Sequence, residues 1–201
     1  MSEAPSFGSD EAYLRQAADS PASLMTPERK TADFAGIFNV PTAVGAVVRE
    51  FRSCEFSTLA RDGTPVTWPT LPFFDHARRR FLITCSIGLA QKAFNVRRDG
   101  RVAMLFSNPT GSGLSSPPLV LIQGDAEAPE DLTPPADGYI ERAQLVFERQ
   151  PVGITMIAVM SGPLRKLADW YGWRIFIYVR PRRIRWWPDG DLDRPCGEVV
   201  T

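Results

Sequence analysis

The stretch Arg80-Phe-Leu-Ile-Thr84-Cys85-Ser86-Ile-Gly88-Leu-Ala-Gln91-Lys92 carries most of the information on the fold and function of this chain. Its apolar run predicts a strand that ends in hydroxyl side chains, and residues 91–97 predict a helix with Lys92 in its first turn. Backbone N–H groups at a helix start, hydroxyls and one cation together form an anion-binding arrangement. The stretch therefore predicts a site for a ligand with a terminal phosphate. The alternative is that the hydroxyls only cap the helix and that Lys92 is solvated.

Strand-like segments flank this corner on both sides. Residues 54–60 and 66–74 are joined by the turn Arg61-Asp-Gly-Thr64, which is typical of a hairpin. Pro69 and Pro72 indicate an edge strand, or backbone N–H groups not used in pairing, because proline lacks the N–H of a central ladder. Further strands are predicted over residues 80–84, 101–106, 119–126 and 174–179, and a further helix over 41–51. This order predicts an antiparallel barrel interrupted by one helix.

Six short pieces occur in a fixed order along the chain: Asp62-Gly-Thr-Pro65, Phe81-Leu-Ile-Thr84, Gln91-Lys-Ala93, Arg101-Val-Ala-Met-Leu-Phe106, Ile122-Gln-Gly-Asp-Ala126 and Val179-Arg-Pro-Arg-Arg-Ile-Arg-Trp-Trp187. Their order resembles the pyridoxamine 5′-phosphate oxidase-like, FMN-binding split-barrel family of the flavin/deazaflavin oxidoreductase superfamily. The resemblance covers residues 40–190 and is strongest to an uncharacterised bacterial subgroup with a loop like 106–113. It implies a mainly β (α+β) fold, a six- to seven-stranded antiparallel split β-barrel with peripheral helices. It also implies a homodimer in which the second subunit completes each flavin site.

The resemblance assigns cofactor binding to ten positions: Trp68, Pro69, Thr70, Leu71, Thr84, Cys85, Ser86, Gln91, Lys92 and Trp187. Gln91 and Lys92 correspond to the residues that hold the flavin phosphate in the family. Residues 84–86 correspond to the strand end that binds the phosphate and the ribityl chain. Residues 68–71 correspond to the strand along the isoalloxazine edge, and Trp187 to a late aromatic residue that approaches the flavin.

Departures from the family pattern argue against oxidation of vitamin B6. The family's oxidases carry an Arg-x-His pair shortly after the late aromatic residue, whereas this chain has no His there. Instead it has Asp189, Asp191 and Asp193, which would repel an anionic vitamin phosphate. Trp68 also replaces an Arg of those oxidases, and Leu119 replaces a Gln beside the flavin.

The sequence leaves two classes of function open. In the first, the chain is an FMN-dependent oxidoreductase that transfers hydride or electrons to or from a small, unidentified molecule. FMN supplies such chemistry without a protein acid/base pair, so the presence of a single histidine, His76, is no obstacle. A variant uses the deazaflavin F420, whose anionic tail would meet Lys92, Arg97 and Arg98. In the second, the protein is a non-catalytic carrier, store or sensor of flavin or haem.

Composition limits the classes of partner. The chain has 201 residues with 23 basic and 23 acidic side chains, so no overall field attracts nucleic acid or a membrane surface. No apolar run approaches the roughly 18 residues of a membrane span, and the first residues lack a secretory signal pattern, so we expect a cytoplasmic protein. The three cysteines, Cys54, Cys85 and Cys196, have neither zinc spacing nor a disulfide framework. We therefore expect no metal site, and no catalytic residue can be assigned.

We expect three parts: an N-terminal arm over residues 1–35, an FMN-binding split-barrel domain over 36–190 and a C-terminal tail over 191–201. Two additional helices are predicted to begin near residues 133 and 161. The loop from Ser107 to Pro118 is rich in Gly, Ser and Pro and is the best candidate for a lid or an interface loop.

Overall fold

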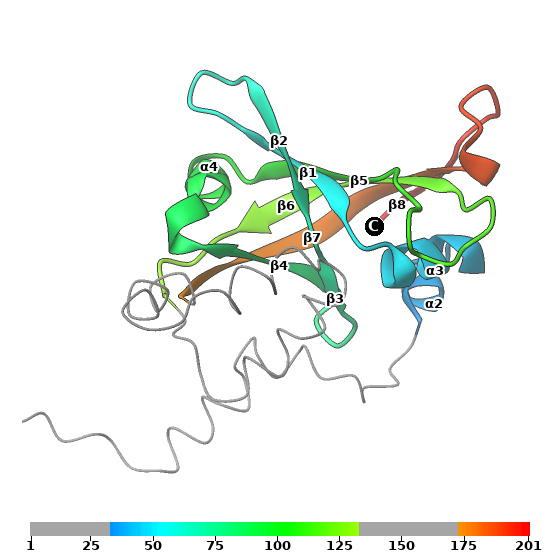
Figure 1. Ribbon diagram of the computed structural model, residues 1–201, viewed down its shortest axis with the longest axis horizontal. Helices are drawn as coiled ribbons and strands as arrows, with labels where there is room; N and C mark the ends of the chain where they lie inside the picture. Colours follow the sequence, from blue (N-terminus) through cyan, green and yellow to red (C-terminus); the bar gives the residue numbers. More distant parts are fainter. Residues whose placement is uncertain (1–32, 133–172) are drawn as a thin grey trace, which may run out of the picture.

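A computed structural model of the chain describes residues 33–132 and 173–201 (Figure 1). Its strands are β1 (Cys54–Leu59), β2 (Pro65–Thr70), β3 (Phe73–Asp75), β4 (Arg80–Ser86), β5 (Arg101–Phe106), β6 (Leu119–Glu127), β7 (Arg174–Trp187) and β8 (Gly197–Val200). Its helices are α2 (Phe34–Phe38), α3 (Thr42–Glu50) and α4 (Gln91–Arg98), with 3₁₀ turns η2 (Ile87–Leu89) and η3 (Pro188–Gly190). The expected arm up to residue 32 and the helices expected near residues 133 and 161 lie outside the described residues.

The strands form one antiparallel sheet in the order β2-β1-β5-β6-β7-β4-β3, with β8 paired to β7. The two end strands of this order, β2 and β3, follow each other in the chain. The sheet therefore curls until its ends are joined by the two residues Leu71 and Pro72. The split-barrel fold with peripheral helices is confirmed. The edge position expected from Pro69 is confirmed too, because β2 pairs with β1 alone among the strands of residues 33–132 and 173–201.

Strand β7 is the longest of the described strands and pairs with three others. It spans 14 residues and pairs with β4 over its first half, with β6 from Tyr178 to its end and with β8 near its end. Its register with β6 shifts at Gln123/Gly124, where Arg182 of β7 has no residue opposite it in β6. This bulge changes which residues face the core, because side chains alternate along a strand. Ile175, Ile177 and Val179 are buried before the bulge, and Ile184 is buried after it.

Aromatic and aliphatic side chains fill the barrel and its helical end. Phe34 of α2 contacts Phe74 and Phe81 with ring centroids 4.8 and 5.8 Å apart. Val44, Val47 and Val48 of α3 are buried at the helical spacing of three and four residues. Figure 1 shows α2 and α3 together at one end of the sheet and α4 at the other. The two ends therefore differ in chemistry: the α2–α3 end is apolar core, and the α4 end carries the polar residues singled out by sequence.

The C-terminal segment is more ordered than the expected tail. Gly197–Val200 form β8, whose residues pair with Arg183–Trp186 of β7. Glu198 accepts a hydrogen bond from the Nε of Arg185 at 2.6 Å, and Val199 packs partly against the core. Short extended runs that alternate polar and apolar side chains add readily to an exposed strand edge, which explains why this segment joins the sheet.

Candidate functional site

The candidate site is the α4 corner, which we define as the end of β4 (residues 84–86), η2 and the first turn of α4. Strand β4 continues to Ser86, which lies opposite Arg174 in β7, so the corner also receives this arginine. The Ser86 side chain is buried, and its Oγ accepts a hydrogen bond from the Gly88 N–H at 3.4 Å. The Ser86 hydroxyl thus caps the 3₁₀ turn η2, whereas α4 itself begins after Ala90 without a side-chain cap.

Lys92 is the central cation of the corner. Its side chain is half-buried, and burial lowers the pKa of the ammonium group, with the nearby Arg174 acting in the same direction and Cys85 opposing it. Its Nζ lies 5.8 Å from the centroid of the Trp68 ring. Within residues 33–132 and 173–201, no carboxylate lies within 4 Å of this ammonium group. A partly desolvated cation of this kind favours an anionic ligand.

Cys85 is a buried thiol. Its Sγ lies 3.7 Å from the carbonyl oxygen of Ile175, to which it donates. Burial raises the pKa of the Cys85 thiol, although Lys92, Arg174 and Arg97 favour the thiolate. The side chain is therefore protonated at neutral pH and does not present a nucleophile.

A polar network lies beneath the first and last turns of α4. Asn95 is fully buried, and its Oδ1 accepts from Gln91 Nε2 at 2.9 Å and from Arg98 Nη2 at 3.1 Å. Its Nδ2 donates to the Thr58 hydroxyl of β1 at 2.9 Å. Arg98 also donates to the Leu59 carbonyl. The network therefore ties α4 to β1 and takes up one N–H of the Gln91 amide.

The arginines at the end of α4 contact main-chain carbonyls. Arg97 donates through Nε to Ala128 at 2.8 Å and through Nη2 to Pro129, and Arg98 donates to Leu59 at 2.6 Å. These bonds use part of the donor capacity of both guanidinium groups. They leave Lys92 as the cation of α4 that faces Trp68.

The structure brings some of the expected site residues together and separates others. Trp68 is 39% exposed and lies beside Lys92, which offers a ligand an aromatic surface next to a cation. Pro69 is exposed, whereas Thr70 and Leu71 are buried. Thr84 is half-buried and lies opposite Phe176 of β7. Buried Thr70 and Leu71 can contact a ligand only where their main chain is reached.

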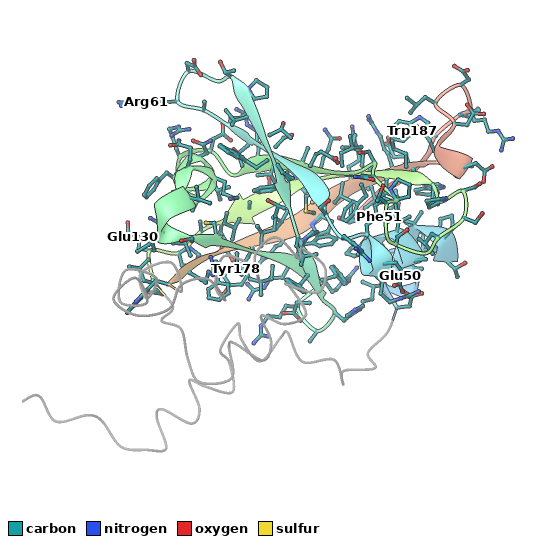
Figure 2. The ribbon with its side chains drawn as sticks, viewed as in Figure 1. Glu50, Phe51, Arg61, Glu130, Tyr178 and Trp187 are labelled. Atoms are coloured by element: carbon teal, nitrogen blue, oxygen red, sulfur yellow. The ribbon has the colours of Figure 1, made fainter. Side chains whose placement is uncertain are left out.

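Trp187 lies far from the α4 corner within one chain. It pairs with Leu119 at the end of β7, whereas Arg174 at the start of β7 pairs with Ser86. At about 3.3 Å per residue the two ends of β7 are roughly 40 Å apart. Figure 2 labels Trp187 at the end of the sheet opposite α4. The acidic residues that follow are partly neutralised, because Arg194 pairs with Asp189 at 3.1 Å and Asp191 at 3.4 Å.

Sequence reasoning did not find Arg174, Thr58 or Asn95. Arg174 reaches the site through the pairing of β7 with β4, and Thr58 through its hydrogen bond to Asn95 of α4. The local sequence carries no signal for either contact. Asn95 could have been found, because it lies between the apolar positions Ala93 and Val96 and four residues after Gln91. A polar residue on the inner face of a helix needs a partner.

Residues 33–132 and 173–201 contain neither a membrane-spanning helix nor a cluster of metal ligands. No helix in this part of the chain is long and apolar enough to cross a membrane. In the same residues, no three His, Cys, Asp or Glu side chains come together as a metal ion would require.

Comparisons with known proteins extend only to structure. No family model and no curated protein matches the sequence. One similar structure is a Clostridium acetobutylicum protein related to general stress protein 26, of the pyridoxinephosphate oxidase family. It is 9% identical to this chain, with a TM-score of 0.51, and the match covers 79% of this chain and 92% of that one. An F420 reductase is 20% identical over 67% of this chain and 90% of its own, with a TM-score of 0.44. The heme storage protein HutZ from Vibrio cholerae is 12% identical over 79% and 92%, with a TM-score of 0.44. At these identities the likeness is one of fold: the chain has the split-barrel fold of the pyridoxamine 5′-phosphate oxidase-like proteins.

Proposed function

We propose that this chain, which has the split-barrel fold of the pyridoxamine 5′-phosphate oxidase-like proteins, binds FMN at the α4 corner and acts as a flavin-dependent oxidoreductase on a small molecule other than a vitamin B6 phosphate. The observation that carries the proposal is the half-buried Lys92 beside the exposed Trp68. A flat ring system with a phosphate on a flexible chain matches an aromatic surface next to a desolvated cation.

The residues of the corner fit such a ligand. Lys92 would bind the phosphate, helped by the N–H groups at the start of α4, and Trp68 would contact the ring system. Bound FMN supplies hydride or electron transfer. The protein then has to bind and orient the cofactor and limit access of water, which does not require a histidine or a reactive thiol. The protonated state of Cys85 is consistent with this division of roles.

The arrangement supports FMN more than F420. F420 carries a long anionic tail that would need several cations along its path. Arg97 and Arg98 already donate to the carbonyl oxygens of Ala128, Pro129 and Leu59. Lys92 alone suits a single terminal phosphate better.

A second copy of the chain belongs to the proposal, because one chain holds Trp187 at the far end of β7. In a homodimer, the Trp187 end of one copy could approach the α4 corner of the other. Leu89 and Phe94 are 58% and 52% exposed beside this corner and could be covered there. Sedimentation of the flavin-loaded protein tests this arrangement, and a stable monomer with bound flavin would contradict it.

The absorbance spectrum of the purified protein and the mass of the released cofactor test the choice of ligand. Titration of the cofactor-stripped protein with FMN, F420 and haem should show the tightest binding for FMN. Tighter binding of F420 or haem would overturn the proposal. The redox rates of the bound FMN are then compared with those of free FMN. If no small-molecule donor reduces the bound FMN faster, and no acceptor reoxidises it faster, a carrier or sensor is supported instead.

A further inference from the structure

We propose that Asn95 is a positioning residue that holds one N–H of the Gln91 amide and so turns the amide oxygen toward the ligand. Gln91 then accepts a hydrogen bond from a hydroxyl group of the FMN ribityl chain, while Lys92 binds the phosphate. This inference rests on the proposed function, because it concerns the same ligand at the same corner. It differs from the expectation that Gln91 holds the phosphate together with Lys92.

The direction of the hydrogen bonds follows from Arg98. A guanidinium group only donates, so the atom of Asn95 that lies 3.1 Å from Arg98 Nη2 must be the acceptor Oδ1. Gln91 contacts the same Oδ1 at 2.9 Å, so it must present its Nε2 there. The Asn95 Nδ2 is left facing the Thr58 hydroxyl, which can accept at 2.9 Å. One assignment of both amides satisfies every contact.

Turning Gln91 around would disrupt this network. Its oxygen would then face the Asn95 Oδ1, placing two acceptors in contact beside a fully buried side chain. Leaving a buried amide in such a contact is costly, so Gln91 keeps its N–H toward Asn95. Gln91 is exposed, and no hydrogen bond to its oxygen occurs within the described ranges. An acceptor at this point repels a phosphate but suits a hydroxyl.

Asn95 also determines how α4 sits against the β1–β2 hairpin. Thr58, its partner, is two residues from Phe56, which lies opposite Trp68 in the hairpin. The network therefore links the helix that carries Gln91 and Lys92 to the strand pair that carries Trp68. The same buried side chain orients one ligand-binding group and sets the spacing between the other two.

Three flavins separate the contributions of the ligand: FMN, riboflavin, which lacks the phosphate, and lumiflavin, which also lacks the ribityl hydroxyls. Gln91→Met keeps the length and helix propensity of the side chain and removes its polar atoms. We expect roughly three- to tenfold weaker binding of both FMN and riboflavin by the same factor, and no change for lumiflavin. A loss confined to FMN would show that Gln91 contacts the phosphate and would overturn the inference. An affinity that the substitution leaves unchanged for each of the three flavins would overturn the inference as well. So would a loss of affinity for lumiflavin as large as the loss for FMN and riboflavin.

Asn95 is tested by two further variants. Asn95→Asp offers only acceptors to Gln91 and Arg98, so it should preserve the riboflavin affinity of the wild type. Asn95→Leu releases Gln91, and adding Gln91→Met to it should then cost riboflavin no further affinity. A full additional loss in this double variant would overturn the positioning role, and so would a loss in Asn95→Asp as large as that in Asn95→Leu. If Asn95→Leu does not fold, as judged by thermal unfolding, Asn95→Asp and Gln91→Met still decide the question.

The outcome also separates this inference from the proposed function. A wild-type protein that fails to bind FMN, or a Lys92→Ala variant that binds it as tightly, removes the proposed function. Weaker FMN binding by Lys92→Ala with no effect of Gln91→Met removes only the role of Gln91.

Discussion

Replacement of Lys92 by alanine is the most direct test of the α4 corner. The change removes the ammonium group beside Trp68 and leaves a residue with high helix propensity in α4. A charge-assisted hydrogen bond to a phosphate contributes about 1.5–3 kcal/mol, so the affinity for FMN should fall about ten- to a hundredfold. Affinity for riboflavin should change little, since riboflavin has no phosphate. The cofactor-free variant should unfold at nearly the wild-type temperature or slightly above it, because a half-buried cation without a nearby carboxylate contributes little to folding.

The assay is equilibrium titration followed by quenching of flavin fluorescence at pH 7.5, where the phosphate is a dianion. Arg61→Ala is the matched control, because Arg61 is an exposed cation at the tip of the β1–β2 hairpin, as Figure 2 shows. It should leave FMN affinity unchanged.

The pH dependence gives a second, independent readout. Burial lowers the pKa of Lys92, so the ammonium group loses its proton at a lower pH than an exposed lysine. Affinity of the wild type for FMN should therefore decline as the pH rises toward 10, and the Lys92→Ala variant should lack this decline. Equal FMN affinity in wild type and variant, with equal pH profiles, would show that Lys92 is a surface residue and would refute the reasoning.

Three other predictions follow from the same structure. Trp68→Ala should weaken binding of both FMN and lumiflavin, by about 1–2 kcal/mol for a lost aromatic contact, while Trp68→Phe retains most of the affinity; fluorescence titration checks this, and an unchanged lumiflavin affinity would argue against contact with the ring. Burial raises the pKa of the Cys54 thiol, so the native state holds this proton after the unfolded thiol, with an ordinary pKa near 8.5, has lost it. The free energy of unfolding of the wild type should therefore decline relative to Cys54→Val as the pH rises above about 8.5, as measured by urea unfolding; a constant difference would contradict the assignment. Gly124→Ala should destabilise the protein by about 1–3 kcal/mol, because a Cβ there would collide with the main-chain oxygen of Arg180. Gly36→Ala should not destabilise it, because the space around Gly36 is open. Thermal unfolding compares the two variants, and equal stabilities would refute the steric argument.

Most of the fold could be predicted from the sequence, because local patterns determine it. The helix starting at Gln91, the helix over 41–51 and the strands around the Asp62-Gly63 turn all lie where their residues indicated. Pro69 and Pro72 indicated an edge strand, and Pro69 lies in β2 at the edge of the sheet. By contrast, the strand predicted over residues 174–179 and the motif at 179–187 were considered separately, although these residues form one strand. Their continuity depends on pairing with β4, β6 and β8, which no local pattern records.

The candidate site was predictable in part for the same reason. The strand end, the helix start and Lys92 are adjacent in sequence, so their juxtaposition follows from a single turn. The approach of Trp68 to Lys92 and the bond between Asn95 and Thr58 depend on tertiary contacts. The direction of the Gln91 amide depends on Arg98, whose role appears only when its partner is known.

The bulge at Arg182 makes β7 one residue longer than its pairing with β6 requires. Because Arg182 has no register partner in β6, its deletion would leave Pro181 opposite Gly124 and Arg183 opposite Gln123, and the two strands would pair without a break. Ile184 would stay opposite Ile122 and keep facing the core. Replacement of the exposed Arg182 by another residue would leave the bulge and this alternation intact. The extra residue acts as a change of phase: odd-numbered positions of β7 face the core before it, and the even-numbered Ile184 faces the core after it.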